Sequence, residues 1–172
     1  KGRVTEKSVE DGNGTQLLWK GFAYQPDNRA SEEYGMIDGS KALISRTEYN
    51  GLGEVVQITD ALGNKTRIDI DKFYCNSYSQ KVIKKSITNP TGIKTEIEFD
   101  PLSRPVTIIK LNPEGVLLSS HQYYYDVSGN KYREIAQQIV GGQLVGSEET
   151  RWQYGLMNRL EEHIQHYGTE NE

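Results

Sequence analysis

The sequence has little of what catalytic or membrane-spanning chains need. It carries one cysteine in 172 residues, so an internal disulfide cannot form. No apolar run approaches the roughly 18 residues that a membrane-spanning helix requires. The formal net charge is -4, with no run of basic residues. Because phosphate binding requires a basic patch, nucleic acid is not an expected partner.

The composition points to strands rather than to disorder. Only 35% of the residues are hydrophobic, 26% are charged, and the mean hydropathy is -0.70. The chain nevertheless contains 11 tyrosines and 17 glycines, together with many Val, Ile and Thr residues. Disordered chains are poor in aromatic and β-branched residues. The composition therefore predicts many short strands joined by tight turns, with one face of a sheet half-buried.

An aromatic residue followed by turn-forming residues recurs about every 25 residues. The six-residue windows that begin at this aromatic, called boxes below, start at Tyr24, Tyr49, Tyr74, Phe99, Tyr125 and Tyr154. Their fifth positions are Asn28, Gly53, Tyr78, Ser103, Gly129 and Asn158. Gly and Asn tolerate a positive φ better than other residues. We therefore expect a turn at each box, with Gly53 and Gly129 at positive φ.

A second series of turn signals lies between the boxes. It is marked by Gly14, Gly39, Gly63, Gly92, Gly115 and Gly142. Residues 89–92 and 112–115 read Asn-Pro-x-Gly, which suits a type I turn. Two turn series in phase predict a β-meander, and residues 1–172 are expected to form a single array of six hairpin units. We expect this array to be a piece of a longer chain.

The segments between the turns alternate as half-buried strands do. In residues 93–100 the odd positions are Ile, Thr, Ile and Phe, whereas the even positions are Lys, Glu, Glu and Asp. Residues 67–71 read Arg-Ile-Asp-Ile-Asp, and Val106 and Ile108 continue the pattern. Each strand is expected to have one apolar face and one charged, solvated face.

Two segments have helical features. Met157, Leu160, Ile164 and Tyr167 lie at helical spacing, and residues 132–140 are rich in helix formers. The repeat register places both where the other copies have strands. Because tertiary pairing overrides propensity, we expect strands in both segments.

The boxes that begin at Tyr49, Phe99 and Tyr125 resemble the Tyr-Asp-x-x-Gly-Arg box of the RHS/YD-repeat family. The resemblance extends over roughly residues 14–168. The second-position aspartate is present as Asp100 and Asp126, and the sixth-position arginine is present as Arg29, Arg104 and Arg159. The chain is thus similar to a degenerate member of the family.

The resemblance implies an all-β fold in which tandem hairpins form a curved antiparallel ribbon, a segment of a hollow shell. In bacterial polymorphic toxins and in the C component of Tc toxins, such a shell encloses a toxin domain. In teneurins a similar barrel belongs to an adhesion protein. The implied partners are neighbouring repeats, another copy or an enclosed toxin domain, and the implied location is secreted or in the cell envelope. No counterpart of the family's autoproteolytic core segment is found, so a wall segment is expected.

Other interpretations of individual residues carry less weight. The box aromatics could bind glycans, as in a binding or adhesion module, but their even spacing favours packing between hairpins. His163 and His166 do not match a metal-ligand spacing and would lie on opposite faces of a strand. Cys75 lacks the nearby base of a nucleophile. We therefore expect no enzyme, no cofactor and no metal site.

Overall fold

The computed structural model describes residues 3–14 and 16–168. Within these residues the fold is all-β, without an α-helix, and contains one 3-10 turn at Leu156–Asn158. The strands are β1 (Glu6–Glu10), β2 (Gln16–Tyr24), β3 (Ala30–Ile37), β4 (Ser40–Tyr49), β5 (Val55–Asp60), β6 (Lys65–Cys75), β7 (Lys81–Thr88), β8 (Lys94–Phe99), β9 (Pro105–Leu111), β10 (Leu117–Tyr125), β11 (Lys131–Val140), β12 (Gln143–Tyr154) and β13 (Leu160–Gly168).

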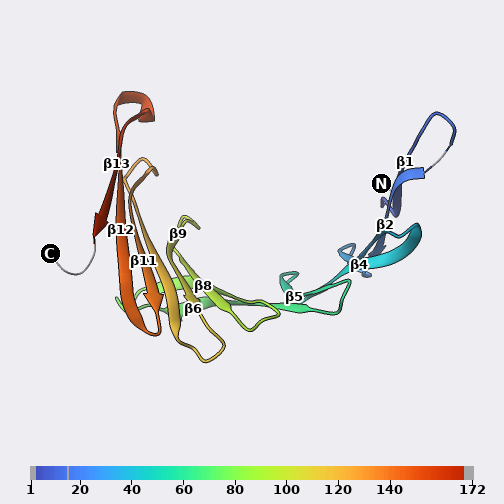
Figure 1. Cartoon of the computed structure of the whole chain (residues 1–172), viewed down its shortest axis with the longest axis horizontal. Coiled ribbons are helices and arrows are strands. Elements are labelled where there is room, and N and C mark those ends of the chain that lie inside the picture. Colours follow the sequence, from blue (N-terminus) through green and yellow to red (C-terminus); the bar gives the residue numbers. More distant parts are fainter. Residues whose placement is uncertain (1–2, 15, 169–172) are drawn as a thin grey trace. The chain divides into compact units, whose positions relative to one another are not determined.

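The strands form an antiparallel meander in which each is hydrogen-bonded to its neighbours in the chain. This confirms the expected tandem hairpins. The chain divides into two compact units, residues 1–68 and 69–172, which are described separately. In the second unit, β8 to β12 follow one another side by side in chain order (Figure 1).

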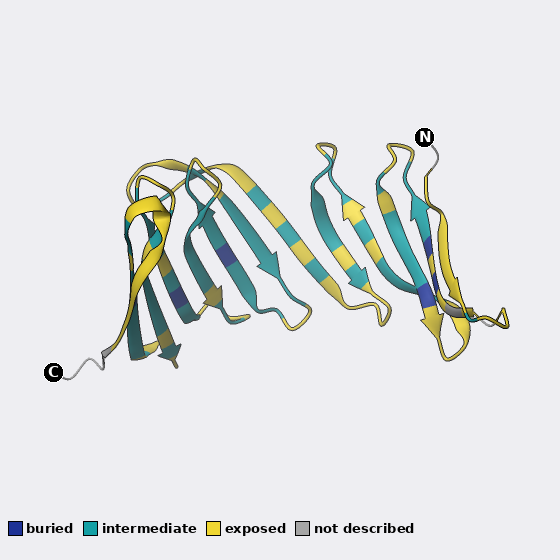
Figure 2. Ribbon diagram, turned by 90° about the horizontal axis from the view of Figure 1, so that it is seen from above, coloured by how far each residue is buried: buried dark blue, intermediate teal, exposed yellow. Residues whose placement is uncertain are grey.

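Each unit is a single layer of sheet without a hydrophobic core. Among the described residues Trp19 is the only buried apolar side chain, and most strand residues are half-buried on either face (Figure 2). Glu96, Ser120 and Thr150 are the buried polar residues of this part. Stability therefore depends on strand pairing, cross-strand side-chain pairs and the turns.

The box turns have a common backbone construction. In the second box the N–H of Gly53 donates to the carbonyl of Asn50, and the N–H of Asn50 donates to the carbonyl of Glu54. The same pair of bonds closes the turns at residues 25–29, 76–80, 100–104 and 126–130, and also those at 60–64, 89–93 and 112–116. Gly53 and Gly129 have φ values of 86° and 91°, as expected. The two turn series predicted from the sequence are thus largely one kind of turn.

A β-bulge accompanies five of the six boxes. In the fifth box Tyr124 pairs with Arg133 but Tyr125 pairs with Lys131, so Tyr132 is an extra residue without a partner. Equivalent shifts occur at the first, second, fourth and sixth boxes. Because a bulge inserts one residue, the alternation of side chains changes phase there.

Two sequence-based expectations need correction. The third box was expected to begin at Tyr74, but its turn lies one residue later, with Asn76 at the second position and Ser79 at φ 58°. Val106 is the extra residue of a bulge, so it does not alternate with Ile108. Both errors arise because spacing alone does not locate an inserted residue.

Residues 132–140 and 157–167 were expected to form strands despite their helical features. Strands β11 and β13 confirm this for residues 131–140 and 160–168. Met157 instead lies in the turn, at φ 64°. Cross-strand pairing has overridden helix propensity in both segments.

The charged strand face is less solvated than expected. Glu96 is 8% exposed, although its position in the sequence predicted a wet surface. The Nζ atoms of Lys84 and Lys94 lie 2.7 and 2.5 Å from its carboxylate oxygens. Burial raises the pKa of Glu96, but hydrogen bonds and charge from the two lysines outweigh this effect and lower it. The lysines thus make burial of this carboxylate tolerable.

Candidate functional site

In four of the six boxes the second residue closes the turn with its side chain. In the fifth box, Oδ1 of Asp126 accepts hydrogen bonds from the backbone N–H groups of Ser128 and Asn130, both at about 2.9 Å or less. Asp100, Asn50 and Asn76 make the same two bonds in their own turns. A carboxylate or an amide oxygen can therefore fill this position, which is the reason for the Asp/Asn preference.

The sixth residue of the box bonds to the other oxygen of the second. Arg104 donates to Oδ2 of Asp100 at 2.7 Å, and Nδ2 of Asn130 donates to Oδ2 of Asp126 at 3.1 Å. Burial raises the pKa of Asp100, but the hydrogen bonds and charge of Arg104 together outweigh this effect and lower the pKa. The turn is thus closed by side chains as well as by backbone.

The box tyrosines connect one hairpin unit to the preceding one. Their hydroxyl groups donate to the backbone carbonyl of the residue that follows the preceding box. Tyr49 donates to Ala30 at 2.8 Å, and Tyr125 donates to Pro105 at 2.9 Å. Tyr154 likewise donates to Lys131 at 3.1 Å. Each of these bonds spans about 20 residues of chain and lies within one unit.

A cation from the preceding box covers the tyrosine ring. The guanidinium carbon of Arg29 lies 4.9 Å from the centre of the Tyr49 ring, and that of Arg104 lies 4.4 Å from the Tyr125 ring. Such contacts stabilise by about 0.5–1 kcal/mol at exposed sites and more when desolvated. We call the hydroxyl bond and the stacked arginine together the latch.

The complete latch is found in three places among the described residues, at Tyr24, Tyr49 and Tyr125. At Tyr24 the hydroxyl donates to the carbonyl of Val4, and Arg3 covers the ring at 5.5 Å, whereas Tyr154 makes the hydroxyl bond alone. Phe99 has no hydroxyl, and Tyr74 is instead covered by Nζ of Lys84 at 4.3 Å. The backbone carbonyl of Arg159 closes its own turn by accepting a hydrogen bond from the N–H of Gly155. The latch therefore varies along the chain with the box sequence.

Sequence reasoning missed a cation–aromatic stack in the second unit. Nζ of Lys131 lies 4.1 Å from the centre of the Trp152 ring, and the His163 ring stacks on the same tryptophan with the ring centres 5.5 Å apart. Lys131 also bonds to Glu134 at 2.6 Å, and Nδ1 of His121 lies 3.2 Å from the same carboxylate. The only signal in the sequence was the lysine that follows the fifth box directly.

Charge pairing also extends along the strands. Glu149 accepts hydrogen bonds from Arg133 at 2.9 and 3.0 Å and from Arg151 at 2.5 Å. The bonds from Arg133 and then Arg151 lower the pKa of Glu149 to about 2. Arg133 lies on β11, whereas Glu149 and Arg151 lie on β12. The bonds from Arg133 therefore join the two strands and help to fix the register of their pairing.

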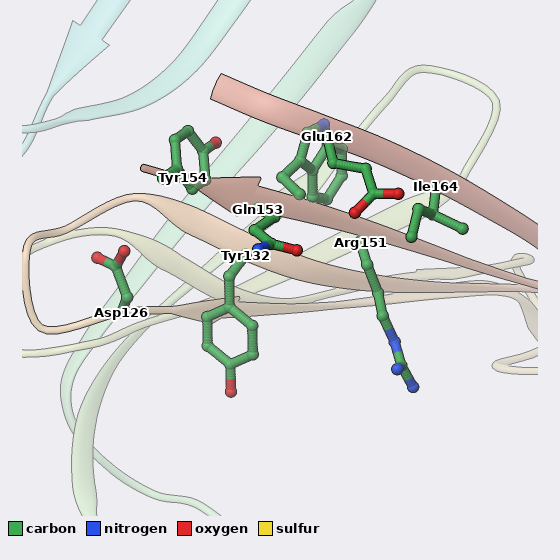
Figure 3. A pocket seen from close by; sticks show the side chains of 8 residues that line it. Asp126, Tyr132, Arg151, Gln153, Tyr154, Glu162 and Ile164 are labelled. Atoms are coloured by element: carbon green, nitrogen blue, oxygen red, sulfur yellow. The ribbon is translucent and has the colours of Figure 1, made fainter. Parts of the chain in front are cut away.

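A shallow hollow of about 400 Å3 lies over β11, β12 and β13. Tyr132 and Arg151 project from one side of the sheet there, whereas Tyr154 projects from the other (Figure 3). Tyr132 and Tyr154 therefore do not form one shared aromatic platform (Figure 3).

The residues that were weighed for chemistry remain apart. Cys75 is exposed at the start of the third turn. His163 pairs with Trp152 and His166 with Glu149, so the two histidines lie on opposite faces of β13, as expected. Within the described residues, no three His, Cys, Asp or Glu side chains gather as a metal site would require. No helix in the described ranges has the length and apolarity to cross a membrane.

No protein-family model matches the chain, and no curated protein matches it. Solved structures of Tc toxins do match. A chain of the Photorhabdus luminescens Tc holotoxin pore shares 16% identity at a TM-score of 0.43, over 91% of this chain and 10% of the other. A chain in the crystal structure of TcdB2-TccC3 shares 16% identity at a TM-score of 0.44, with the same coverage. The chain thus spans about a tenth of the length of the chains it resembles.

Proposed function

We propose that this chain is a structural wall segment of an RHS/YD-repeat shell, which encloses a toxin or effector domain within a large secreted or envelope protein. The observation that carries the proposal is the box turn, which is repeated along a single layer of sheet. Within each compact unit, the latch connects one hairpin to the preceding hairpin. Its partners are then the neighbouring repeats and the enclosed domain.

The construction suits a wall. Most residues on both faces of the sheet are half-buried or exposed, and the described part contains one buried apolar side chain. A single layer cannot exclude water from a binding pocket of its own, but it can separate two spaces. Where it is present, the latch holds a hairpin in register with the one before it, so the array can extend by adding like hairpins.

The role needs no catalytic residue. The acidic side chains with shifted pKa values form ion pairs or close turns, as Asp100, Glu96 and Glu149 do. Structural ion-pair networks shift pKa values in the same way as catalytic sites. The boxes Tyr24, Tyr49, Tyr74, Phe99, Tyr125 and Tyr154 are accordingly proposed to be structural.

Limited proteolysis of the longer protein that contains this chain tests the proposal. If the chain is a wall, the enclosed domain should resist a protease that cleaves it readily when it is produced alone. A Tyr49→Ala/Tyr125→Ala double variant should open the wall and increase the cleavage rate, whereas Tyr78→Ala should leave the rate unchanged. Equal cleavage of the enclosed and the free domain would contradict the proposal.

A further inference from the structure

The box turns of the second unit present large apolar side chains to solvent. The tips of the turns at residues 76–80, 100–104, 126–130 and 155–159 carry Tyr78, Leu102, Val127, Leu156 and Met157, which are 81, 72, 107, 90 and 87% exposed. We call these five residues the apolar rim. Exposed apolar residues are common singly, but a row of them along one edge of a molecule marks an interaction site.

The turns at the other end of the same strands differ in character. The residues at their tips are Pro90, Thr91, Pro113, Glu114 and the pair Gly141–Gly142, and the apolar residues beside these tips, Val116 and Val140, are 39 and 60% exposed. The central positions of a type I turn accept most residues, so the backbone does not require apolar side chains in the box turns. The side chains that close each turn, such as Asp126, lie at other positions of the box. The apolar rim is therefore not explained by the turn itself.

The tips are held in a fixed row. Consecutive box turns are two strands apart, which corresponds to about 10 Å. Nδ2 of Asn130 donates to Oδ1 of Asn158 at 3.2 Å, which connects the last two turns directly. The guanidinium of Arg104 lies within 3.5 Å of the point that a Cβ on Gly129 would occupy, so the fourth and fifth turns are also neighbours.

The charges on these turns suit a protein partner better than a lipid surface. The four turns contain Asp100, Asp126, Arg104 and Arg159, two acidic and two basic residues, so they are neutral within a chain of net charge -4. Membrane-binding surfaces combine apolar residues with an excess of Lys and Arg, which attract anionic lipids. A neutral rim instead allows two like surfaces to meet without repulsion.

We propose that the apolar rim is a docking surface for the same rim of a second copy of this chain. An evenly spaced row is complementary to itself about a two-fold axis, because the tips of one copy fit between the tips of the other. A partner of another kind would need to reproduce the spacing of about 10 Å. The inference holds whether or not the chain is part of a shell.

The size of the rim sets the strength of this association. The five exposed side chains supply roughly half of the ~800 Å² that each partner contributes to a standard interface. The dimer should therefore be weak, with a dissociation constant in the micromolar to millimolar range, and it should depend strongly on concentration.

Sedimentation velocity over a concentration series tests the proposal. The wild-type chain should pass from monomer to dimer, and Leu102→Ser/Val127→Ser/Leu156→Ser/Met157→Ser should weaken the dimer by about tenfold or more. Leu62→Ser is the matched control, since Leu62 is 87% exposed in a turn of the other series. Circular dichroism should show the same strand content in all three proteins.

Cross-linking locates the contact independently. In a Cys75→Ser background, Leu102→Cys should form dimers with a short bismaleimide, whereas Glu114→Cys at the opposite end of the strands should not.

A wild-type chain that stays monomeric at every concentration would overturn the proposal. So would a dimer that the four serines leave unchanged, because pairing through the edge strands β1 or β13 would then be its cause. Rim-dependent binding to phosphatidylcholine–phosphatidylglycerol vesicles by a monomeric chain would also overturn it and make lipid the partner.

Discussion

The fifth box and the third box form the same turn with different residues. The fifth has Tyr125, Asp126 and Gly129, whereas the third has Cys75, Asn76 and Ser79 at the corresponding positions. Both second residues cap the turn through Oδ1, and both fifth residues have a positive φ. The comparison separates two tasks within one motif. The second and fifth positions form the turn, and the aromatic position attaches it to the preceding hairpin.

We expect the aromatic position, which attaches the turn to the preceding hairpin, to contribute more to the free energy of unfolding than the positions that form the turn. Tyr125 combines a half-buried ring, a hydroxyl bond to Pro105 and the stacked Arg104. We expect Tyr125→Ala to lower the free energy of unfolding by about 2–3 kcal/mol, somewhat less than for a fully buried aromatic. Tyr125→Phe should lose about 1 kcal/mol, the hydroxyl bond alone.

Urea unfolding followed by circular dichroism measures these differences. Tyr78→Ala is the matched control, because this tyrosine is 81% exposed in the third turn, and its loss should stay within about 0.5 kcal/mol. Equal losses at Tyr78 and Tyr125 would mean that the latch does not hold the hairpins together.

The next prediction concerns Arg29, the arginine of the latch at Tyr49, which a side chain at Gly53 would displace. Gly53 and Gly115 have similar φ values, 86° and 81°. Alanine at either position should cost about 1 kcal/mol for the left-handed backbone. A Cβ at Gly53 would also clash with the guanidinium of Arg29, which covers Tyr49, whereas a Cβ at Gly115 meets nothing within 4 Å.

We therefore expect Gly53→Ala to lower the unfolding free energy by about 2 kcal/mol and Gly115→Ala by about 1 kcal/mol. Thermal unfolding of the two variants in parallel checks the difference. If the losses are the same, displacing Arg29 has no energetic consequence and its stacking on Tyr49 is incidental.

The cap of the turn should be interchangeable between aspartate and asparagine. Asp126→Ala removes the acceptor of two backbone N–H groups and should cost about 1 kcal/mol. Asp126→Asn should stay within about 0.5 kcal/mol, since Asn76 performs the same task in the third box. Chemical denaturation distinguishes the two, and an asparagine as damaging as alanine would show that charge, not the acceptor oxygen, closes the turn.

The smallest effect should appear in acid. Burial raises the pKa values of Asp100 and Asp126, but hydrogen bonds to the carboxylates outweigh this and lower them below 3.8. A depressed pKa contributes stability above the unfolded value, and this stability is lost as the pH falls below about 4. The boxes whose turns are capped by Asn50 or Asn76 have an amide at this position, so lowering the pH does not protonate their caps.

Melting temperatures measured from pH 6 down to pH 2.5 should therefore fall less steeply in an Asp100→Asn/Asp126→Asn variant than in the wild type. Glu149, whose pKa is about 2, is present in both proteins, so its contribution to the pH dependence is the same in both and cancels in the comparison. If the melting temperatures of the two proteins fall in parallel, protonation of Asp100 and Asp126 does not lower the stability of the fold.

Much of the fold could be read from residue types alone. Gly53, Gly129 and the Asn-Pro-x-Gly segments located their turns correctly, because few other residues suit those backbone positions. The alternation in residues 65–71 also appears in the structure, where Ile68 and Ile70 are half-buried and Asp69 and Asp71 are exposed. The roles of the box residues within a shell, and the single array over residues 1–172, stay predictions.

The sequence by itself determined that two series of turns alternate along the chain and that the segments between them are strands, since both follow from local backbone preferences and short-range periodicity. The tertiary structure alone decided the partners of the side chains: Tyr125 on Pro105, Lys131 on Trp152, and the two lysines around Glu96. Partners such as these are fixed by strand register, and one bulged residue changes both the pairing and the face that follows. The inserted residue differs in type from box to box, for example Val106 and Tyr132, so residue type alone does not reveal the bulge.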